Sequence, residues 1–454
     1  MKNLIILPES VKFIINKLIK ANFKAYAVGG CVRDSLLGEE PHDWDICTNA
    51  LPNETKSVFS EYKIIETGIK HGTVTLLIDS QPYEITTFRS ETTYSDNRHP
   101  DNVIFEKNID ADLSRRDFTI NAIAYNEHDG IIDLFNGQSD LKNNIISTVG
   151  DSDTRFNEDA LRILRALRFA SVLGFQIESN TKESIHKNKN LLKNVAVERI
   201  WVEFKKLILG KNNVEILREY ADVISVFIPQ INDMIGFEQK NPHHCYDVWE
   251  HTLHALSFAS DDVIVRLAVF FHDIGKPTTF SVDEDGIGHF YGHHQVSREI
   301  TKNVLENLKV DNRTKNDVVT LVEFHDRIIN PNQKSVNKAI RKIGSRELFK
   351  KLCDVKFCDV NGQSPNLINN RITDLEIIRT IFKEVCSKDD FIMTVKDLEI
   401  NGYDIMELGV EKGERIGFIL ETLFNLVVDN KVPNQNNLLK EKALKIINSD
   451  FRKI

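Results

Sequence analysis

The hydrophobic pattern of this chain changes near residue 157. Before that point, apolar residues at helical spacing predict a helix over 8–22. Short apolar runs predict strands over 25–28, 44–47, 63–66, 73–78 and 83–88, and residues 79–82 are typical of a hairpin turn. After Asn157 the apolar residues recur at the helical period. We therefore expect an α/β head with a mixed sheet, followed by a largely helical remainder.

A polar segment interrupts this pattern between residues 90 and 113. It is rich in Ser, Thr, Asp and Asn and has few apolar residues. Such a composition is typical of a surface loop. We predict a mobile loop here and not a core element.

The composition indicates a globular protein with several modules, since 454 residues are too many for one core. The hydrophobic fraction is 41%, and no apolar run reaches the ~18 residues of a membrane span. The apolar run near Met1 is too short for a signal peptide. We therefore expect a cytoplasmic protein without a membrane partner. None of the six cysteines forms a Cys-x-x-Cys pair, which argues against a zinc ribbon or a disulfide framework.

The net charge of −9 argues against a nonspecific nucleic-acid coat. Residues 155–219 nevertheless contain thirteen Lys or Arg against eight Asp or Glu. This local excess of positive charge could bind a compact RNA, although a solvated pair of amphipathic helices would have the same composition.

A glycine pair near the N-terminus suits phosphate binding. Gly29 and Gly30 separate the strand over 25–28 from a short helix predicted over 32–37. They free backbone amides at the helix start to meet a triphosphate. Arg33 adds a charged fork for the same anion.

Paired carboxylates follow this turn. Asp43 and Asp45 are two residues apart, so on a strand both side chains project from one face. Two such carboxylates can hold a pair of divalent cations about 3.5–4 Å apart. Trp44, between them, would point into the core.

Residues 115–122 read Arg-Arg-Asp-Phe-Thr-Ile-Asn-Ala. Arg116 offers a donor fork and Asp117 an acceptor, a pair that suits a phosphate and a ribose hydroxyl. A structural salt bridge between Arg116 and Asp117 would leave the same sequence.

Residues 158–168 are expected to form one helix, which places Asp159 and Arg162 on one face. Cytosine and adenine present an amine beside an unprotonated ring nitrogen, whereas uracil and guanine present a carbonyl beside an N–H. An Asp acceptor beside an Arg donor therefore fits C and A and rejects U and G. Glu158, four residues before Arg162, could brace that guanidinium.

These motifs resemble those of the bacterial (class II) tRNA nucleotidyltransferase and poly(A) polymerase family. The resemblance implies an enzyme that adds C, C and A to the 3′ end of tRNA from CTP and ATP, with two Mg²⁺ ions at Asp43 and Asp45. It also implies a third carboxylate, for which we nominate Glu84, although an ordinary strand glutamate would look the same. The nucleotide-binding residues that it implies are Gly30, Arg33, Arg116, Asp117, Asp159, Arg162, Arg165 and Arg168, the last two continuing a basic stripe toward phosphate or RNA. Residues 197–205 match a helical segment of the family whose role is mainly structural.

A second set of ligand-type residues begins at His251. It resembles the HD superfamily of metal-dependent phosphohydrolases, in the version fused to tRNA nucleotidyltransferases. The resemblance implies a divalent transition metal at His251, His272, Asp273 and Asp359, with His272 and Asp273 on a helix that Gly-Lys-Pro then ends. His293, His294 and His325 are candidates for a second metal or for phosphate contacts. Alternatively, this module keeps its fold as a scaffold and has lost catalysis.

The resemblance divides the chain into four parts: a nucleotidyltransferase head (1–150), a helical neck with template and RNA-binding helices (151–235), an HD domain (240–365) and a helical body and tail (366–454). Two other functions stay open. One is a poly(A) polymerase or an A-only enzyme with the same head. The other is an HD phosphohydrolase whose head only senses nucleotides.

Overall fold

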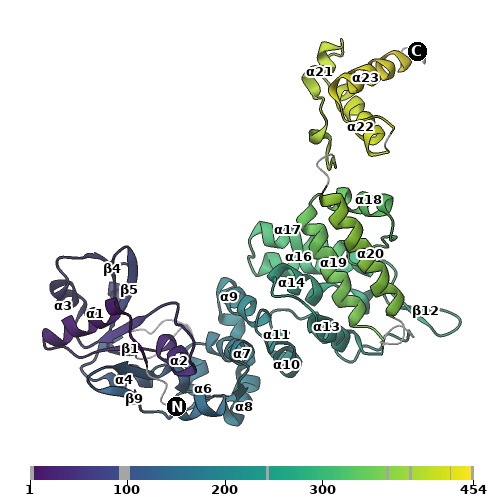
Figure 1. Cartoon of the computed structure of the whole chain (residues 1–454). Coiled ribbons are helices and arrows are strands. Elements are labelled where there is room, and N and C mark those ends of the chain that lie inside the picture. Colours follow the sequence, from purple (N-terminus) through teal and green to yellow (C-terminus); the bar gives the residue numbers. More distant parts are fainter. Residues whose placement is uncertain are drawn as a thin grey trace. The chain divides into compact units, whose positions relative to one another are not determined.

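The computed structural model describes residues 5–91, 103–241, 245–364, 368–387, 391–429 and 431–450. The chain divides into two compact units, whose elements are labelled in Figure 1. Unit 1 comprises Met1–Ile235 and Asn303–Asp311, and unit 2 comprises Gly236–Lys302 and Asn312–Ile454. The division of the chain into four functional parts stays a prediction.

A seven-stranded mixed sheet forms the centre of unit 1. In spatial order its strands are β3 (Lys63–Ile65), β4 (Thr73–Ile78), β5 (Gln81–Thr87), β2 (Asp45–Thr48), β1 (Ala25–Val28), β8 (Ile123–Asn126) and β9 (Gly130–Asp133). Strands β2 and β5 run parallel, and the other neighbouring pairs of this sheet are antiparallel. All residues of β1 are buried, because both faces of the sheet are covered at its centre. The predicted α/β head with a mixed sheet is confirmed.

The five predicted strands are all present: β1 and β4 have the predicted ends, and in the other three one or both ends are shifted by one or two residues. The turn between β4 and β5 is tighter than predicted, because Ile78 already pairs with Gln81. Asp79 and Ser80 alone reverse the chain, with φ values of 50° and 66°, as the favoured two-residue hairpin turn requires. Strands β8 and β9 were not predicted.

The segment 103–114 corrects the prediction of a loop over 90–113. Strand β7 (Val103–Phe105) pairs with β6 (Arg89–Glu91), and helix α4 (Ile109–Ser114) follows. Ile109 and Leu113 of α4 are buried against core residues of β1 and β2. Two apolar residues four positions apart are enough to bury one face of so short a helix. The helix was not predicted because the residues around these two are polar. Residues 92–102, in the middle of the predicted loop, lie outside the described residues.

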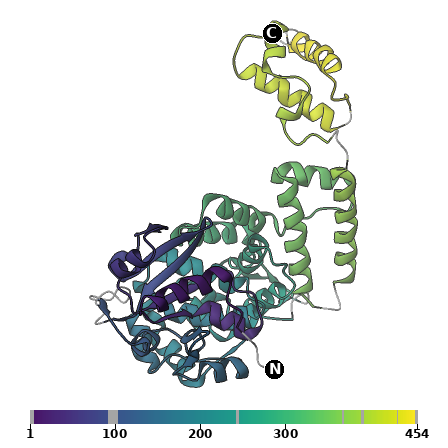
Figure 2. The ribbon, with the colours of Figure 1, turned by 60° about the vertical axis from the view of Figure 1, so that its left-hand side comes forward.

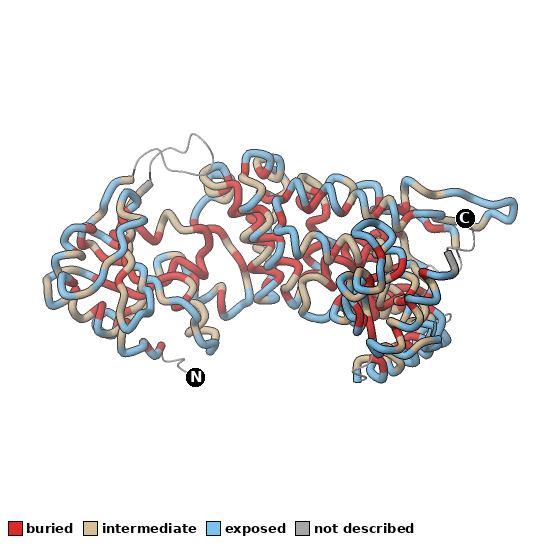
Figure 3. Tube along the Cα trace, turned by 90° about the horizontal axis from the view of Figure 1, so that it is seen from above, coloured by how far each residue is buried: buried red, intermediate tan, exposed pale blue. Residues whose placement is uncertain are grey.

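The remaining α-helices of unit 1 are four to thirteen residues long. They are α1 (Glu9–Lys20), α2 (Gly30–Leu37), α3 (Pro52–Val58), α5 (Gly137–Asn143), α6 (Ser152–Glu158), α7 (Leu161–Leu173), α8 (Ser179–Asn188), α9 (Val197–Ile208), α10 (Asn213–Glu219), α11 (Ala221–Ile224) and α12 (Ile231–Met234). A two-residue parallel ladder joins β10 (Ile145–Ile146) to β11 (Gln176–Ile177). Buried residues run through the interiors of these elements, as the red segments of Figure 3 show.

The prediction of one helix over 158–168 is wrong. Helix α6 ends at Glu158, Asp159 is extended (φ −138°, ψ 102°), and α7 begins at Leu161. The carboxylate of Asp159 accepts a hydrogen bond from the backbone N–H of Leu161 at 3.1 Å. Aspartate favours such local bonds at helix starts over a place inside a helix, so the chain turns here.

Unit 2 is helical apart from the small hairpin β12 (Ser281–Val282) and β13 (Gly288–His289). Its helices are α13 (Val248–Leu256), α14 (Val263–Phe271), α15 (Lys276–Thr279), α16 (His293–Asn307, whose last residues belong to unit 1), α17 (Asn312–Phe324), α18 (Gln333–Ile343), α19 (Arg346–Asn361), α20 (Asn369–Cys386), α21 (Gly402–Glu407), α22 (Glu414–Val428) and α23 (Asn436–Asp450). The long helices α19 and α20 pack side by side (Figures 1 and 2). Helices α21, α22 and α23 share a hydrophobic core of their own. The predicted helical remainder is confirmed.

Among the described helices, none combines the length and the apolar character that crossing a membrane requires.

Candidate nucleotide and metal sites

Three carboxylates gather at one end of the parallel strand pair. Asp45 of β2 lies directly opposite Glu84 of β5 in the sheet register, so both side chains leave the sheet on the same face. Partial loss of water raises the pKa of Asp45; Arg116 opposes this shift and Asp43 adds to it. Loss of water followed by repulsion from Asp45 and Asp43 raises the pKa of Glu84. Within the described parts of the chain none of the three forms an ion pair, so this concentration of negative charge fits divalent cations.

The surroundings of these carboxylates correct two details. Strand β2 begins at Asp45, so Asp43 lies in the loop before the strand and not on it. Trp44 is half-buried, not a core residue. Asp43 nevertheless lies close enough to Asp45 and Glu84 to raise the pKa of both carboxylates by repulsion.

The glycine turn has a geometric reason. Helix α2 begins at Gly30, and Gly29 before it has a φ of 84°, a conformation that favours glycine. A Cβ atom at Gly29 would lie 2.9 Å from Nη1 of Arg116. The turn therefore brings the backbone within reach of a guanidinium, as a phosphate site requires.

Asn121 connects two predicted nucleotide-binding residues. Arg33 donates through Nη1 to Oδ1 of Asn121 at 2.7 Å, and Asn121 donates through Nδ2 to Asp117 at 3.2 Å. Arg165 closes the chain of contacts with two bonds to Oδ2 of Asp117, at 2.6 and 2.8 Å. Burial opposes the charge of Asp117, but Arg165 and Arg162 outweigh it and lower its pKa well below the usual range. No role for Asn121 was predicted from the sequence.

Asp112 holds the two arginines that precede Asp117. This fully buried carboxylate accepts hydrogen bonds from Nε and Nη2 of Arg115, at 3.0 and 2.7 Å, and from Nη2 of Arg116 at 3.3 Å. The alternative of an Arg116–Asp117 salt bridge is therefore not what forms, because each residue has another partner. Asp112 was also missed, although its spacing of three and four residues from the arginines was a usable signal.

The break between α6 and α7 opens onto a cavity of about 280 Å³. Its lining residues are Arg115, Arg116, Asp117, Asp159, Leu161, Arg162, Arg165 and Arg199. Arg162 donates to Oε2 of Glu158 at 2.6 Å and to the backbone oxygen of Arg115 at 2.9 Å. The predicted bracing of Arg162 by Glu158 is confirmed.

Arg199 was not predicted to lie at this site. It reaches from α9 to the carboxylate of Asp159, with Nη2 2.9 Å from Oδ2 and Nη1 3.3 Å from Oδ1. The acceptor proposed to select the base is thus oriented by a guanidinium forty positions further along the chain, which spacing alone could not reveal.

Arg168 lies outside the residues that line this cavity. Its guanidinium stacks on the ring of Phe169 at 3.9 Å and contacts Glu203 at 2.8 Å. Burial lowers the pKa of Arg168 to about 10, against the attraction of Glu203. Arg165 and Arg168 therefore both have carboxylate partners in the protein.

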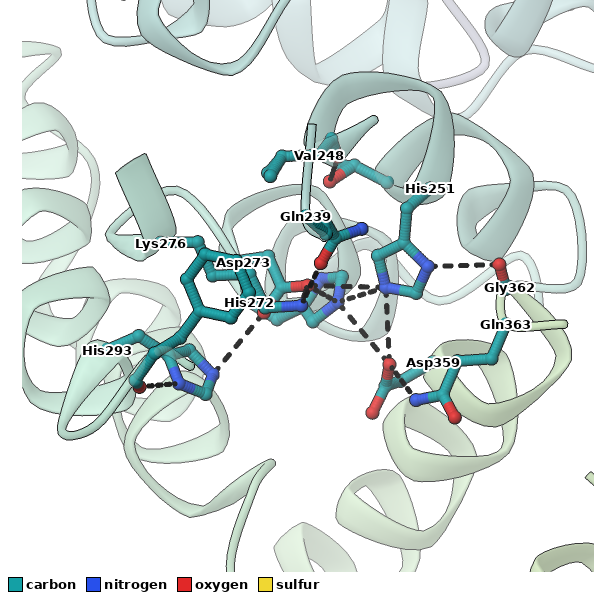
Figure 4. Close-up of polar contacts among 12 residues, drawn as sticks. Gln239, Val248, His251, His272, Asp273, Lys276, His293, Asp359, Gly362 and Gln363 are labelled. Atoms are coloured by element: carbon teal, nitrogen blue, oxygen red, sulfur yellow. Dashed lines mark hydrogen bonds and ion pairs between the residues drawn. The ribbon is translucent and has the colours of Figure 1, made fainter. Parts of the chain in front are cut away.

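Unit 2 brings the four residues of the predicted HD metal site together (Figure 4). Oδ2 of Asp273 lies 3.2 Å from Nε2 of His251 and 3.1 Å from Nε2 of His272. Oδ1 of Asp359 lies 3.2 and 3.7 Å from the same two nitrogens. Helix α14 ends at Phe271, so His272 and Asp273 lie just after the helix, and Lys276 begins α15. This corrects the expectation that His272 and Asp273 lie on a helix.

Charge within this cluster is tightly compensated. Burial opposes an imidazolium at His272, but Asp273 and Asp359 outweigh it and raise the pKa to about 10. Burial likewise opposes the carboxylate of Asp273, while His272 and Lys276 lower its pKa well below the usual range. The buried carboxylates of Asp273 and Asp359 stabilise a positive charge beside them. That charge can be a proton on an imidazole or a metal ion.

His293 and His325 face the other oxygen of Asp273, with Nε2 atoms 3.4 and 3.7 Å from Oδ1. Nδ1 of His294 lies 3.9 Å from Asp326, and these two residues form a further set of converging ligand atoms with His293.

Three protein families match successive parts of the chain. The "Poly A polymerase head domain" matches residues 25–147, and the "Probable RNA and SrmB- binding site of polymerase A" matches residues 174–234. Residues 279–443 match tRNA nucleotidyltransferase domain 2.

Individual relatives match over nearly the full length. The CCA-adding enzyme of Ligilactobacillus salivarius is 35% identical over 438 residues, covering 96% of this chain and 95% of that protein. The crystal structure of the Bacillus stearothermophilus CCA-adding enzyme in complex with CTP aligns with a TM-score of 0.72 at 28% identity, covering 98% of both chains. The Thermotoga maritima CCA-adding enzyme complexed with tRNA shares the fold, with a TM-score of 0.59 at 21% identity and coverage of 97% and 96%. By its head motifs and by this similarity along almost its whole length, the chain belongs to the family of CCA-adding enzymes.

Proposed function

We propose that this chain adds C, C and A in turn to the 3′ end of tRNA, using CTP and ATP and releasing pyrophosphate. The observation that carries this function is the cavity in which Asp159 and Arg162 lie beside Arg116 and Asp117. It offers a base-reading pair next to phosphate- and ribose-binding groups, in a chain 35% identical to a CCA-adding enzyme. Because tRNA, CTP and ATP would be its substrates, the place of action that we propose is the cytoplasm.

Base selection would follow from hydrogen-bond polarity. Asp159 accepts a hydrogen bond from the exocyclic amine of cytosine or adenine, and Arg162 donates one to the adjacent ring nitrogen. Uracil and guanine would place a carbonyl against Asp159 and an N–H against Arg162, so both contacts with the base would be mismatched, at a cost of about 1–3 kcal/mol for each. Glu158 and the backbone oxygen of Arg115 fix the Arg162 guanidinium, so its donors are aimed before the base arrives.

The transfer site would lie at the three carboxylates. Asp43 and Asp45, with Glu84 beside them, would hold two Mg²⁺ ions. Bound Mg²⁺ supplies a lowered pKa for the attacking 3′-hydroxyl and neutralises charge on the triphosphate. Gly30, Arg33 and Arg116 orient the triphosphate, and Asn121 keeps Arg33 in place.

One assay separates this function from its rivals. The purified chain is given tRNAs that end before CCA, after C, or after CC, with each labelled nucleoside triphosphate in turn. We expect C, then C, then A, and no further extension. Addition of A alone would indicate an A-only enzyme, and a long A tail would indicate a poly(A) polymerase. No addition to any of the three would overturn nucleotidyl transfer and favour a nucleotide-sensing head.

We also propose that His251, His272, Asp273 and Asp359 hold a divalent transition metal and hydrolyse phosphate esters, which would make residues 240–365 an HD domain. Imidazole and carboxylate ligands suit such metals, and each of the two histidines lies within 3.7 Å of both carboxylates. When bound, the metal supplies a water of lowered pKa.

Hydrolysis of a 2′,3′-cyclic phosphate or a phosphomonoester tests this second activity. We expect turnover with one of Mn²⁺, Ni²⁺ or Co²⁺, lost in Asp273→Ala while CCA addition continues. No turnover with any of these ions or with Mg²⁺ would favour the scaffold alternative.

A further inference from the structure

One aromatic ring lies among the arginines of the proposed nucleotide site. Phe169 of α7 is 6% exposed, and three guanidiniums lie over its ring. The Cζ atom of Arg168 lies 3.9 Å from the centre of the ring, that of Arg33 5.0 Å and that of Arg165 5.5 Å. A positive charge within about 6 Å of a ring centre is attracted by the electrons of the ring face. Phe169 therefore attracts three charged groups at once.

These guanidiniums come from two separate segments of unit 1. Two of them belong to α7, the helix of Phe169 itself, whereas Arg33 belongs to α2, which begins at the glycine turn. A Cβ atom at Gly30 would lie 3.7 Å from Nη2 of Arg33, so this guanidinium lies beside the turn that would receive the triphosphate. The ring of Phe169 thus connects the triphosphate site with the helix that also carries Arg162.

Each of the three guanidiniums has a carboxylate partner. The ion pairs are Arg33–Asp34 (2.8 Å), Arg165–Asp117 (2.6 Å) and Arg168–Glu203 (2.8 Å). The negative charges reduce the repulsion between the guanidiniums, so that all three can lie around one ring. The attraction of the ring is then added to the ion pairs and is not spent against repulsion.

The contacts of Arg33 hold different parts of its guanidinium. Nε donates to Asp34 at 2.8 Å and Nη1 donates to Asn121 at 2.7 Å. Hydrogen bonds of a guanidinium lie in its plane and hold its edges, whereas the ring of Phe169 attracts the charge centred on Cζ. Phe118 packs against that ring at nearly a right angle, with 5.8 Å between the ring centres. The ring is therefore held in place and can define the position of Arg33.

We propose that Phe169 is a positioning residue, whose ring holds Arg33 at the triphosphate site and joins it to the base-reading helix α7. The inference rests on the proposed nucleotidyl transfer, in which Arg33 orients the triphosphate. Phe169 is buried and acts through the arginines. It therefore affects the triphosphate part of CTP and ATP, which the two nucleotides share, and not the choice of base.

Fluorinated phenylalanines at position 169 test this role with little change in the shape of the ring. Each added fluorine withdraws electrons from the ring face and weakens its attraction for a cation. The full chain is prepared with phenylalanine or with its mono-, di- or trifluorinated form at this position. Calorimetry measures the Kd of inorganic tripolyphosphate in the presence of Mg²⁺. Initial rates with tRNA give KM and kcat for CTP and ATP.

We expect the Kd of tripolyphosphate and both KM values to rise stepwise with the number of fluorines. The rise should reach about three- to thirtyfold in the trifluorinated protein, the range of a lost cation–ring contact. CTP and ATP should change equally. The preference for C over U should stay the same, because Asp159 and Arg162 keep their contacts.

Phe156 is the matched control. It is a fully buried ring of α6, and within the described residues it is not among the rings over which a guanidinium lies. The same fluorinated series at Phe156 should leave Kd, KM and kcat unchanged. Equal changes at both positions would indicate a general effect on packing and would overturn the positioning role of Phe169.

The remaining outcomes separate this inference from the proposed function. If the parent protein adds CCA and fluorination at position 169 leaves its constants unchanged, the inference alone is overturned. If the parent protein neither adds nucleotides nor binds tripolyphosphate, the proposed function is overturned and this inference with it.

Discussion

Arg199 and Asp159 form an ion pair, 2.9 Å between Nη2 and Oδ2, at the point where α6 gives way to α7. The pair links the break in the backbone to α9, and the carboxylate also caps Leu161. The orientation of the Asp159 carboxylate therefore depends on a residue of α9. Selection of the base as proposed above would then require both residues, although of the two only Asp159 would contact the base.

Asp159→Ala should slow addition of C and A about ten- to a hundredfold, the equivalent of one lost buried partner of about 1–3 kcal/mol. Addition of U or G should fall less, so the selectivity ratio should drop. Single-turnover rates for the four nucleotides measure this directly. Equal slowing of all four nucleotides would show that Asp159 does not select the base.

Arg199→Gln should lower the same selectivity ratio while leaving the carboxylate in place. The expected effect is smaller than that of Asp159→Ala, since Asp159 keeps its bond to Leu161. Glu198→Gln is the matched control on the same helix, because Glu198 contacts Lys309 and not Asp159. A positioning role predicts a changed ratio only in the Arg199 variant; an equal change in both would indicate a general effect on α9.

Asp43→Ala or Asp45→Ala should abolish nucleotide addition and leave tRNA affinity nearly unchanged, because the carboxylates would bind metal and not RNA. Rapid-quench assays and filter binding measure the two properties separately. More than a few percent of the normal rate in the double variant would exclude the two-metal assignment.

The rate should fall on acidification at a higher pH than ordinary carboxylates would require. Loss of water and mutual repulsion raise the pKa values of Asp45 and Glu84, so both take up protons earlier as the pH falls. Since Mg²⁺ competes with those protons, more Mg²⁺ should move the acidic limb to lower pH. If the acidic side of the pH–rate profile did not change with the Mg²⁺ concentration, protonation of a group other than these two carboxylates would limit the rate.

Asp112→Asn should destabilise unit 1 by about 3–5 kcal/mol at neutral pH, because it leaves two arginines without their buried partner. Burial works against the carboxylate, yet Arg116 and Arg115 lower its pKa overall. The pKa of this carboxyl group is lower in the folded state than in the unfolded state, where it is about 3.9, so its charge stabilises the folded protein at pH values above 3.9. This stabilisation is lost as the pH falls through the folded-state pKa. The difference from the parent protein in urea unfolding should therefore shrink in acid.

Asp110→Asn is the control for that measurement. Asp110 lies on the same helix but is exposed, and a surface change of this kind is expected to stay within about 0.5 kcal/mol. Equal losses in the two variants would mean that the helix, and not the Asp112 contacts, sets the stability.

Much of the head could be predicted because its signals are local. The strand over 73–78 and the helix around α1 follow directly from apolar spacing. Glu84 was nominated only from the family resemblance, and the parallel pairing that sets it opposite Asp45 was not predicted. Asp159 shows the opposite case: the period of its neighbours favours a helix, but a bond from its own side chain to Leu161 turns the chain.

Other parts depend on contacts between distant segments, which no local period encodes. Arg199 meets Asp159 only after α9 has packed against α7. His293 and His325 reach Asp273 from separate helices, so their type was visible in the sequence but their grouping was not. Asn121 was visible too, yet its link between Arg33 and Asp117 exists only in three dimensions.

The strand order also has a consequence during synthesis. Asp43 and Asp45 leave the ribosome before Glu84, and β1 stays open on one side until β8 has been made and has paired with it. Asn121 and Asp117 arrive in that same late stretch. A growing chain that has emerged only as far as β2 thus carries Asp43 and Asp45 without Glu84, Asp117 and Asn121, which the proposed reaction also requires. Enzymatic competence would begin only when the last strands dock, so an unfinished chain would not consume nucleotides.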